Sequence, residues 1–258
     1  MPLRVGFDLD GVLADMESEL VRQAEILFGS AMTRRLQERS GEAPPAGDAA
    51  SEPVDEPQTP TPPGAADEAP MDDVPTLQKL NMTARQQRRL WRHAVSIENF
   101  WETLNELEPG VIKRLSELAV ARRWEIIFLT KRPETVGATA QVQSQRWLQS
   151  KGFDLPSVYV VQGSRGRIAA ALGLDVVIDD RPENCLDVVV DSKARAILVW
   201  RADEKQLPAA ARRLGIGVVA SVGTCLDILS QIDMQKSEQP GVMARVMRLL
   251  GLKEPTPA

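Results

Sequence analysis

The chain has 258 residues, of which 43% are hydrophobic and 26% charged, and its formal net charge is −5 at pH 7. These values are those of an ordinary globular protein with a full core, and the acidic balance argues against nucleic acid as a partner. Composition alone leaves open one large domain or two small ones.

The chain opens with an apolar run, Leu3 to Leu9, which predicts a strand that ends in acidic residues and a glycine. Apolar residues then recur at helical spacing between Ala14 and Phe28. The chain therefore begins with a predicted strand followed by a predicted helix.

The stretch from Gly41 to Pro75 holds nine of the 18 prolines and nine acidic residues, with no Lys or Arg. Such a segment cannot bury enough apolar surface to offset its conformational entropy, so we predict a disordered insertion. The rest of the chain then carries −5 + 9 = +4 charges, which suits a small anionic substrate.

Helical spacing returns from Thr83 to Ala94 and begins with a pattern typical of a capping box, Thr83 with Gln86. An apolar segment follows from Ile97 to Leu107. A further helix is predicted after Pro109 and runs to Val120, because proline favours the first helical position.

From Trp124 onward, short apolar runs alternate with helical patterns. The predicted strands are Glu125 to Leu129, Ser157 to Val161, Asp175 to Ile178, Ala196 to Trp200 and Gly217 to Ala220. The predicted helices lie near Thr139 to Ser150, Arg165 to Leu172, Glu183 to Val190 and Glu204 to Leu214. Strands that are apolar throughout and alternate with helices predict an α/β fold, a Rossmann-like, doubly wound parallel sheet covered on both faces.

The end of the chain predicts two more helices. Leu226 to Ile232 has the pattern of a closing helix, and a short amphipathic helix is predicted after Pro240 from apolar residues at Val242, Val246, Leu249 and Leu250. We expect this last helix to pack on the domain, and a contact with a partner or a membrane is the alternative.

Polar side chains follow the predicted strands at the edge where parallel sheets bind their ligands. They are Asp8 and Asp10, then Thr130 and Lys131, then Asp179, Asp180 and Arg181. Strand alternation points Asp8 and Asp10 the same way, and Gly11 allows a tight turn. Neighbouring carboxylates repel unless a cation lies among them, and oxygen ligands favour Mg²⁺. A solvated acidic turn is the alternative for the first motif by itself.

Four motifs in this order resemble those of the haloacid dehalogenase-like (HAD-like) superfamily of phosphohydrolases. The pattern DxDG[VT] matches Asp8 to Val12, the second motif Thr130, the third Arg165, and the acidic pair Asp179 and Asp180. Lysine is the commoner residue in the third motif. The resemblance covers Leu3 to Gly29 and Pro109 to about Trp200.

The resemblance implies an aspartyl-phosphate mechanism. Asp8 would be the nucleophile, and Asp10 would protonate the leaving oxygen and later activate water. The metal ion would be Mg²⁺, held by Asp8, the Asp10 carbonyl and Asp180.

It also implies how the substrate is held. Thr130 and Arg165 would bind the phosphate, and Asp179 would be a supporting acid. Lys131 and Arg181 are further candidates for substrate binding, and neutralising the nearby acids is their alternative role.

The longer signature, Asp8 to Asp15 with Ile178 to Pro182, is similar to the 5′(3′)-deoxyribonucleotidase and 5′-nucleotidase branch. That branch places its cap between the first and second motifs. Phe100, Trp101 and Trp91 are then candidates for a wall around a nucleobase, because aromatic rings stack on bases. Packing of the cap helices is the alternative role of these rings.

The implied domains are a catalytic core, a helical cap and a tail. The core comprises residues 1–29 and 109–235. The cap, inserted between the first and second motifs, comprises 30–108 and contains the insertion at about 41–75. The tail comprises 236–258.

The leading hypothesis is a Mg²⁺-dependent phosphomonoester hydrolase acting on a nucleoside monophosphate. A phosphatase of sugar phosphates or other small phosphomonoesters is the second hypothesis. A catalytically silent binding module is the third, and the presence of both Asp8 and Asp10 argues against it.

Cys185 and Cys225 lie forty positions apart, and His93 is the only histidine, which argues against a zinc site. The N-terminus lacks a signal-peptide core, and no apolar run approaches the roughly 20 residues needed to span a bilayer. We therefore expect a cytoplasmic protein without a membrane partner, with both cysteines in the core. The sequence leaves the oligomeric state open.

Overall fold

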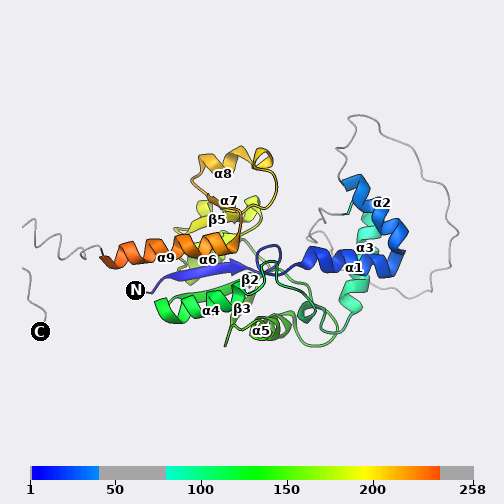
Figure 1. Cartoon of the computed structure of the whole chain (residues 1–258), viewed down its shortest axis with the longest axis horizontal. Helices are drawn as coiled ribbons and strands as arrows, with labels where there is room; N and C mark the ends of the chain where they lie inside the picture. Colours follow the sequence, from blue (N-terminus) through cyan, green and yellow to red (C-terminus); the bar gives the residue numbers. More distant parts are fainter. Residues whose placement is uncertain (1, 41–79, 239–258) are drawn as a thin grey trace, which may run out of the picture. The chain divides into compact units, whose positions relative to one another are not determined.

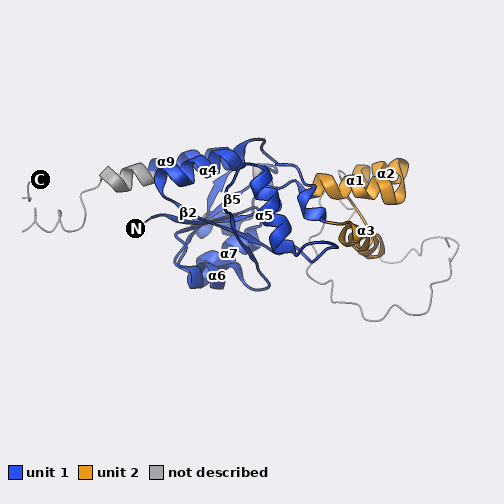
Figure 2. Ribbon diagram, turned by 90° about the horizontal axis from the view of Figure 1, so that it is seen from below, with its two compact units in different colours: residues 1–16, 99–258 blue, residues 17–98 orange. Residues whose placement is uncertain are grey.

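The computed structural model describes residues 2–40 and 80–238 and divides into two compact units (Figures 1 and 2). One unit comprises Met1–Met16 and Asn99–Ala258, and the other Glu17–Glu98. The predicted insertion at about 41–75 and the predicted helix after Pro240 lie outside the described residues.

A six-stranded parallel sheet forms the centre of the first unit, with strand order β3-β2-β1-β4-β5-β6. The strands are β1 (Arg4–Asp8), β2 (Glu125–Thr130), β3 (Ser157–Val160), β4 (Val176–Asp179), β5 (Arg195–Val199) and β6 (Gly217–Val219). The residues of β1, β2 and β4 are almost all buried, which explains their unbroken apolar sequences. The predicted parallel α/β sheet is confirmed.

Helices cover both faces of this sheet, as a doubly wound fold requires. They are α4 (Val111–Arg122), α5 (Ala140–Ser150), α6 (Arg165–Leu172), α7 (Pro182–Asp191), α8 (Ala209–Arg213) and α9 (Val222–Glu238), with 3₁₀ turns η1 (Phe100–Glu102) and η2 (Glu204–Gln206). Figure 2 shows α4 and α9 on one side of the sheet and α6 and α7 on the other.

One sequence prediction of secondary structure was wrong in detail. The predicted helix Glu204 to Leu214 is split into η2 and α8, since Pro208 disfavours helical backbone in the residue before it. The apolar segment Ile97 to Leu107, for which the sequence analysis named no element, contains the short 3₁₀ turn η1.

The cysteines belong to the packed interior of the first unit. Cys185 and Cys225 are both free and fully buried. Burial raises the pKa of Cys185 and raises the pKa of Cys225 to about 12. Neither thiol is therefore a good nucleophile.

The second unit contains α1 (Met16–Phe28), α2 (Ser30–Ser40) and α3 (Ala84–Ser96). The predicted capping box opens α3: the Gln86 N–H donates to Thr83 Oγ1 (3.3 Å), and the Thr83 N–H donates to Gln86 Oε1 (2.9 Å). Among the described residues, no helix is both long and apolar enough to cross a bilayer.

The helix α1 belongs to this helical unit, although the sequence assigned residues up to 29 to the core. Two contacts tie α1 to α3. Gln23 Oε1 lies 3.1 Å from His93 Nε2, and the Arg89 guanidinium lies 5.4 Å from the ring centroid of Phe28. The boundary of the compact unit therefore falls at Met16 and Glu17.

Candidate active site

The strand β1 ends at Asp8 in the middle of the sheet, between β2 and β4. The strand register places the ends of these neighbours, Thr130 and Asp179, on either side of Asp8. Three predicted site residues therefore meet at one edge, which is the carboxyl edge of the sheet.

The chain turns back immediately after β1. The Gly11 N–H donates to the Ala14 carbonyl (3.0 Å), and the Ala14 N–H donates to the Leu9 carbonyl (2.8 Å). Gly11 has φ = +83°, and a Cβ built on it would lie 2.0 Å from Asp180 Oδ2. Glycine is therefore needed at this position both for the backbone conformation and to leave room for the Asp180 carboxylate.

Asp8 is paired with a buried arginine from α6. The two side chains are 6% and 2% exposed as residues, and Arg165 Nη2 donates to Asp8 Oδ1. Gly166 lets α6 lie directly against α7, because a Cβ there would come within 2.0 Å of the Asp187 carbonyl oxygen. This close packing holds Arg165 beside Asp8.

The Arg165 guanidinium retains unused donors. Among the described residues, neither Nε nor Nη1 has a hydrogen-bond acceptor, although Nε lies 3.6 Å from Asp179 Oδ2. Buried donors without acceptors cost free energy, and guanidinium groups bind phosphate oxygens well. Arg165 therefore has N–H donors available for an anionic ligand.

Two acids follow β4 and differ in their surroundings. Asp179 is fully buried and accepts hydrogen bonds from the Arg181 N–H (2.9 Å) and from Asn184 Nδ2 (3.0 Å). Burial raises the pKa of Asp179, while Arg165 and these donors oppose the rise. Burial and then the charge of Asp179 raise the pKa of Asp180 to about 7.

Asp10 is held by an arginine that the sequence did not single out. Arg132 Nε lies 2.9 Å from Asp10 Oδ2, and Arg132 Nη2 lies 2.8 Å from Asp10 Oδ1. Its third nitrogen, Nη1, donates to Ser144 Oγ (2.9 Å). The guanidinium carbon lies 4.9 Å from the ring centroid of Trp101 and 5.5 Å from that of Trp147.

Thr130 lies beside this pair. Its hydroxyl donates to Asp10 Oδ2 (3.3 Å) and accepts from the Arg132 N–H (3.3 Å). Phosphate binding by Thr130 stays a prediction, and the hydroxyl contacts that the structure gives are to Asp10 and to the backbone of Arg132.

Three other predicted substrate-binding residues have contrasting surroundings. The side chains of Lys131 and Arg181 are exposed. Trp101 is fully buried, and its Nε1 donates to the Pro133 carbonyl (2.9 Å). This burial agrees with the packing role that we gave Trp101 as an alternative.

Arg201, which the sequence analysis also missed, stabilises the turn after β1. Arg201 Nη1 donates to the Gly11 carbonyl (2.6 Å) and Nη2 to the Val12 carbonyl (3.1 Å). Arg201 also pairs with Glu108 (2.7 Å), whose carboxylate accepts the first two N–H groups of α9 at 2.8 and 2.9 Å. Since Arg201 follows β5, the strand-end rule would have found it if we had extended the rule to that strand.

The site carries more negative than positive charge. Burial raises the pKa of Asp8 well above its usual value, Arg165 opposes the rise, and the other three aspartates add to it. Four carboxylates at this edge face two buried guanidinium groups. A cation would relieve the excess.

The donors present fit Mg²⁺. Within residues 2–40 and 80–238, no three acidic, histidine or cysteine side chains gather closely enough to hold a metal by themselves. The Asp10 carboxylate is engaged by Arg132, so Asp10 has its backbone carbonyl to offer. The carboxylates of Asp8 and Asp180 and this carbonyl form an all-oxygen set, which Mg²⁺ prefers.

We expect the free energy of unfolding of the metal-free protein to fall as pH rises from 5 to 8. Asp180 binds its proton more tightly in the folded state, with a pKa of about 7, than in the unfolded state, so the unfolded state binds fewer protons in this window. Asp180→Asn should remove about 2 to 3 kcal/mol of this fall, since one pKa unit is worth about 1.4 kcal/mol and about two units of the shift lie between pH 5 and pH 7.

Melting curves in chelator at both pH values measure this change. Asp154→Asn, which removes an exposed acid, is the matched control and should leave the pH dependence as it is. An unchanged pH dependence in Asp180→Asn would contradict the prediction.

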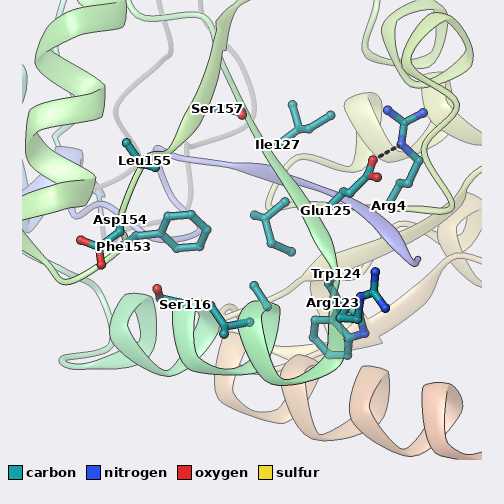
Figure 3. Close-up of a pocket in the computed structure, with 13 residues that line it drawn as sticks. Arg4, Ser116, Arg123, Trp124, Glu125, Ile127, Phe153, Asp154, Leu155 and Ser157 are labelled. Carbon is teal, nitrogen blue, oxygen red and sulfur yellow. Dashed lines mark hydrogen bonds and ion pairs between the residues drawn. The ribbon is translucent and has the colours of Figure 1, made fainter. Parts of the chain in front are cut away.

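A pocket of about 610 Å³ lies at the opposite edge of the sheet (Figure 3). It is lined by residues at the starts of β1, β2 and β3, including Arg4, Glu125 and Ser157. Arg4 and Glu125, which are paired on the adjacent strands β1 and β2, form an ion pair in its lining (2.7 Å). None of the predicted site residues lines this pocket, so its position gives no support for catalysis there.

The chain matches no model of a known protein family and no curated protein sequence. Among solved structures, it is similar to a proposed beta-phosphoglucomutase from Thermotoga maritima, with a TM-score of 0.50 and 18% identity over 89% of this chain and 99% of that chain. The predicted Rossmann-like fold is confirmed. This likeness concerns the fold and leaves the activity to the residues.

Two further structures are more distant. A hydrolase from Pseudomonas syringae has a TM-score of 0.47 and 18% identity over 90% of this chain and 99% of that chain. A HAD family hydrolase from Deinococcus radiodurans R1, solved with bound phosphate and sodium, has a TM-score of 0.46 and 14% identity over 89% and 96% of the two chains.

Proposed function

We propose that this protein is a Mg²⁺-dependent phosphomonoester hydrolase that forms an aspartyl-phosphate on Asp8. The observation that carries the proposal is the Arg165 guanidinium, which is buried, bonded to Asp8 and left with two nitrogens, Nε and Nη1, whose N–H groups have no acceptors among the described residues. A phosphate group would bring oxygens to those N–H groups and its phosphorus to the Asp8 carboxylate.

The reaction has two steps. A carboxylate oxygen of Asp8 attacks the phosphorus, the bond from phosphorus to the leaving oxygen breaks, and Asp10 gives that oxygen a proton. Water then attacks the phosphorus and passes a proton to Asp10, and the bond between Asp8 and phosphorus breaks to release inorganic phosphate. Mg²⁺, held by Asp8, Asp180 and the Asp10 carbonyl, would supply positive charge to the phosphate oxygens.

The substrate we favour is a sugar phosphate or a similar small phosphomonoester. The nucleotidase hypothesis offered Phe100, Trp101 and Trp91 as a wall for a base, and all three rings are buried. The similar Thermotoga protein is named as a phosphoglucomutase, which also favours a sugar phosphate. A nucleoside monophosphate remains the alternative.

The expected cellular setting is part of this proposal. The two free cysteines agree with a reducing, cytoplasmic location. Phosphate release from a panel of sugar phosphates and nucleoside monophosphates would test the substrate, and preference for nucleotides would restore the nucleotidase hypothesis.

Chelation of divalent ions should lower the rate of phosphate release on the order of 100-fold or more, because a bound metal is worth several kcal/mol of charge stabilisation. Adding Mg²⁺ back should restore the rate. Ca²⁺ should inhibit, since its longer bonds and higher coordination number would misplace the phosphorus relative to Asp8.

Rates after chelation, followed by separate addition of each ion, measure these effects. Full activity in excess chelator would refute the metal requirement. Equal rescue by Ca²⁺ would refute the geometric argument alone.

A further inference from the structure

We infer that Arg132 is the positioning residue of Asp10. Its forked guanidinium group fixes the orientation from which Asp10 exchanges a proton with the leaving oxygen. The inference rests on the proposed hydrolase function. It goes beyond that function because it assigns the acid–base step a partner that lies outside the four sequence motifs.

The fork engages both oxygens of the acid. Arg132 Nη2 and Nε donate to Asp10 Oδ1 (2.8 and 3.1 Å), and Nε also donates to Oδ2 (2.9 Å). The terminal torsion of an aspartate is broad when nothing holds it. A guanidinium that contacts both oxygens sets the plane of the carboxylate.

The fork is itself immobilised. The Arg132 guanidinium lies over the rings of Trp101 and Trp147, and each ring is anchored by its own hydrogen bond. Trp101 Nε1 donates to the Pro133 carbonyl (2.9 Å), and Trp147 Nε1 donates to the Leu104 carbonyl (2.8 Å). Arg132 Nη1 is occupied by Ser144 Oγ. Every nitrogen of the guanidinium therefore has a partner within the protein, and the side chain is 0% exposed, so Arg132 is not placed to bind substrate itself.

Of this ion pair, Asp10 is accessible to solvent and Arg132 is not. The Arg132 side chain is 0% exposed, while the Asp10 side chain is 14% exposed at the same edge as Asp8. A buried ion pair adds little stability compared with apolar packing, so stability alone does not account for this arrangement. A residue that only positions Asp10 can be fully buried, as Arg132 is, whereas Asp10 itself must stay accessible to the substrate.

A substrate comparison separates positioning from a general structural role. The value of kcat/KM reports the steps up to release of the first product, so it includes protonation of the leaving oxygen and excludes the later attack of water. An alkyl alcohol needs that proton, whereas p-nitrophenolate leaves without it. Loss of Asp10 positioning should therefore affect an alkyl phosphate far more than p-nitrophenyl phosphate.

We expect Arg132→Gln to lower kcat/KM for glycerol 2-phosphate by about 100-fold or more and for p-nitrophenyl phosphate by less than about tenfold. Arg132→Lys keeps the charge between the two rings but has no fork, so it should show the same asymmetry. If Arg132→Gln fails to fold, Arg132→Lys tests the positioning role instead. Arg146→Gln, which removes an exposed arginine of α5, is the matched control and should change neither value.

A double variant completes the test. Once Asp10→Asn has removed the acid, adding Arg132→Gln should cause no further loss with glycerol 2-phosphate. Equal losses on both substrates, or additive losses in the double variant, would overturn the positioning role and leave the proposed function standing. A wild-type protein that releases phosphate from neither substrate would overturn the proposed function and this inference with it.

Discussion

Asp8→Asn is expected to lower phosphate release by at least about 10⁴-fold, because an amide oxygen cannot replace the carboxylate as the nucleophile. The fold should remain intact. Burial outweighs Arg165 in raising the pKa of Asp8, so the ionised carboxylate is unfavourable in the metal-free protein. The variant should therefore melt at the same temperature as the wild type or higher at neutral pH.

Phosphate-release assays and melting curves on the same preparations test both parts of this prediction. Asp154→Asn removes an exposed acid far from the carboxyl edge and should retain full activity. Wild-type turnover by Asp8→Asn would refute the nucleophile assignment. A melting temperature well below that of the wild type would instead attribute the loss of activity to unfolding.

Gly11→Ala should lower turnover by about 10³-fold or more, because a misplacement of about 1 Å in an active site already costs about 100-fold. The added Cβ would lie 2.0 Å from Asp180 Oδ2 and 2.6 Å from Asp180 Cγ. The Asp180 side chain is too short to escape without turning away from Asp8 and Asp10. The carboxylate that we propose as a metal ligand would then be lost.

Gly110→Ala provides a closely matched control. Gly110 has φ = +82°, nearly the value at Gly11, but a Cβ there would meet no atom within 4 Å. Both variants carry the same backbone penalty of about 1 to 2 kcal/mol, so the difference between them isolates the contact with Asp180. Turnover measured at saturating Mg²⁺ in both variants tests the argument, and equal activity would contradict it.

The fold could be predicted because its central strands are buried on both faces, so their sequences are apolar without interruption. The strand-end rule then located Asp8, Thr130 and Asp179 at one edge. By contrast, α2 shows little periodicity, since Thr33 and Leu36 are the two residues of this helix that the structure describes as buried. A pattern that sparse does not distinguish a helix from a polar loop.

Arg132 could not be predicted because Lys131 and Arg132 are adjacent basic residues after the same strand. Sequence spacing says that both lie at the carboxyl edge, and it does not say which one turns inward. Trp101 and Trp147 decide this; they come from η1 and α5 and lie 46 positions apart in the chain. Only the tertiary structure brings these rings together.

The position of β1 has a consequence for synthesis of the protein. This strand is made well before its partners β2 and β4, which begin at residues 125 and 176, and the arginine that donates to the turn after it is residue 201. Pairing between segments so distant in sequence forms slowly, and an unpaired apolar strand is prone to aggregation. On the ribosome, the surroundings of Asp8, the proposed nucleophile, therefore form only after most of the core has emerged. A nascent chain halted before Arg201 would lack the hydrogen bonds that this arginine gives to the turn after β1.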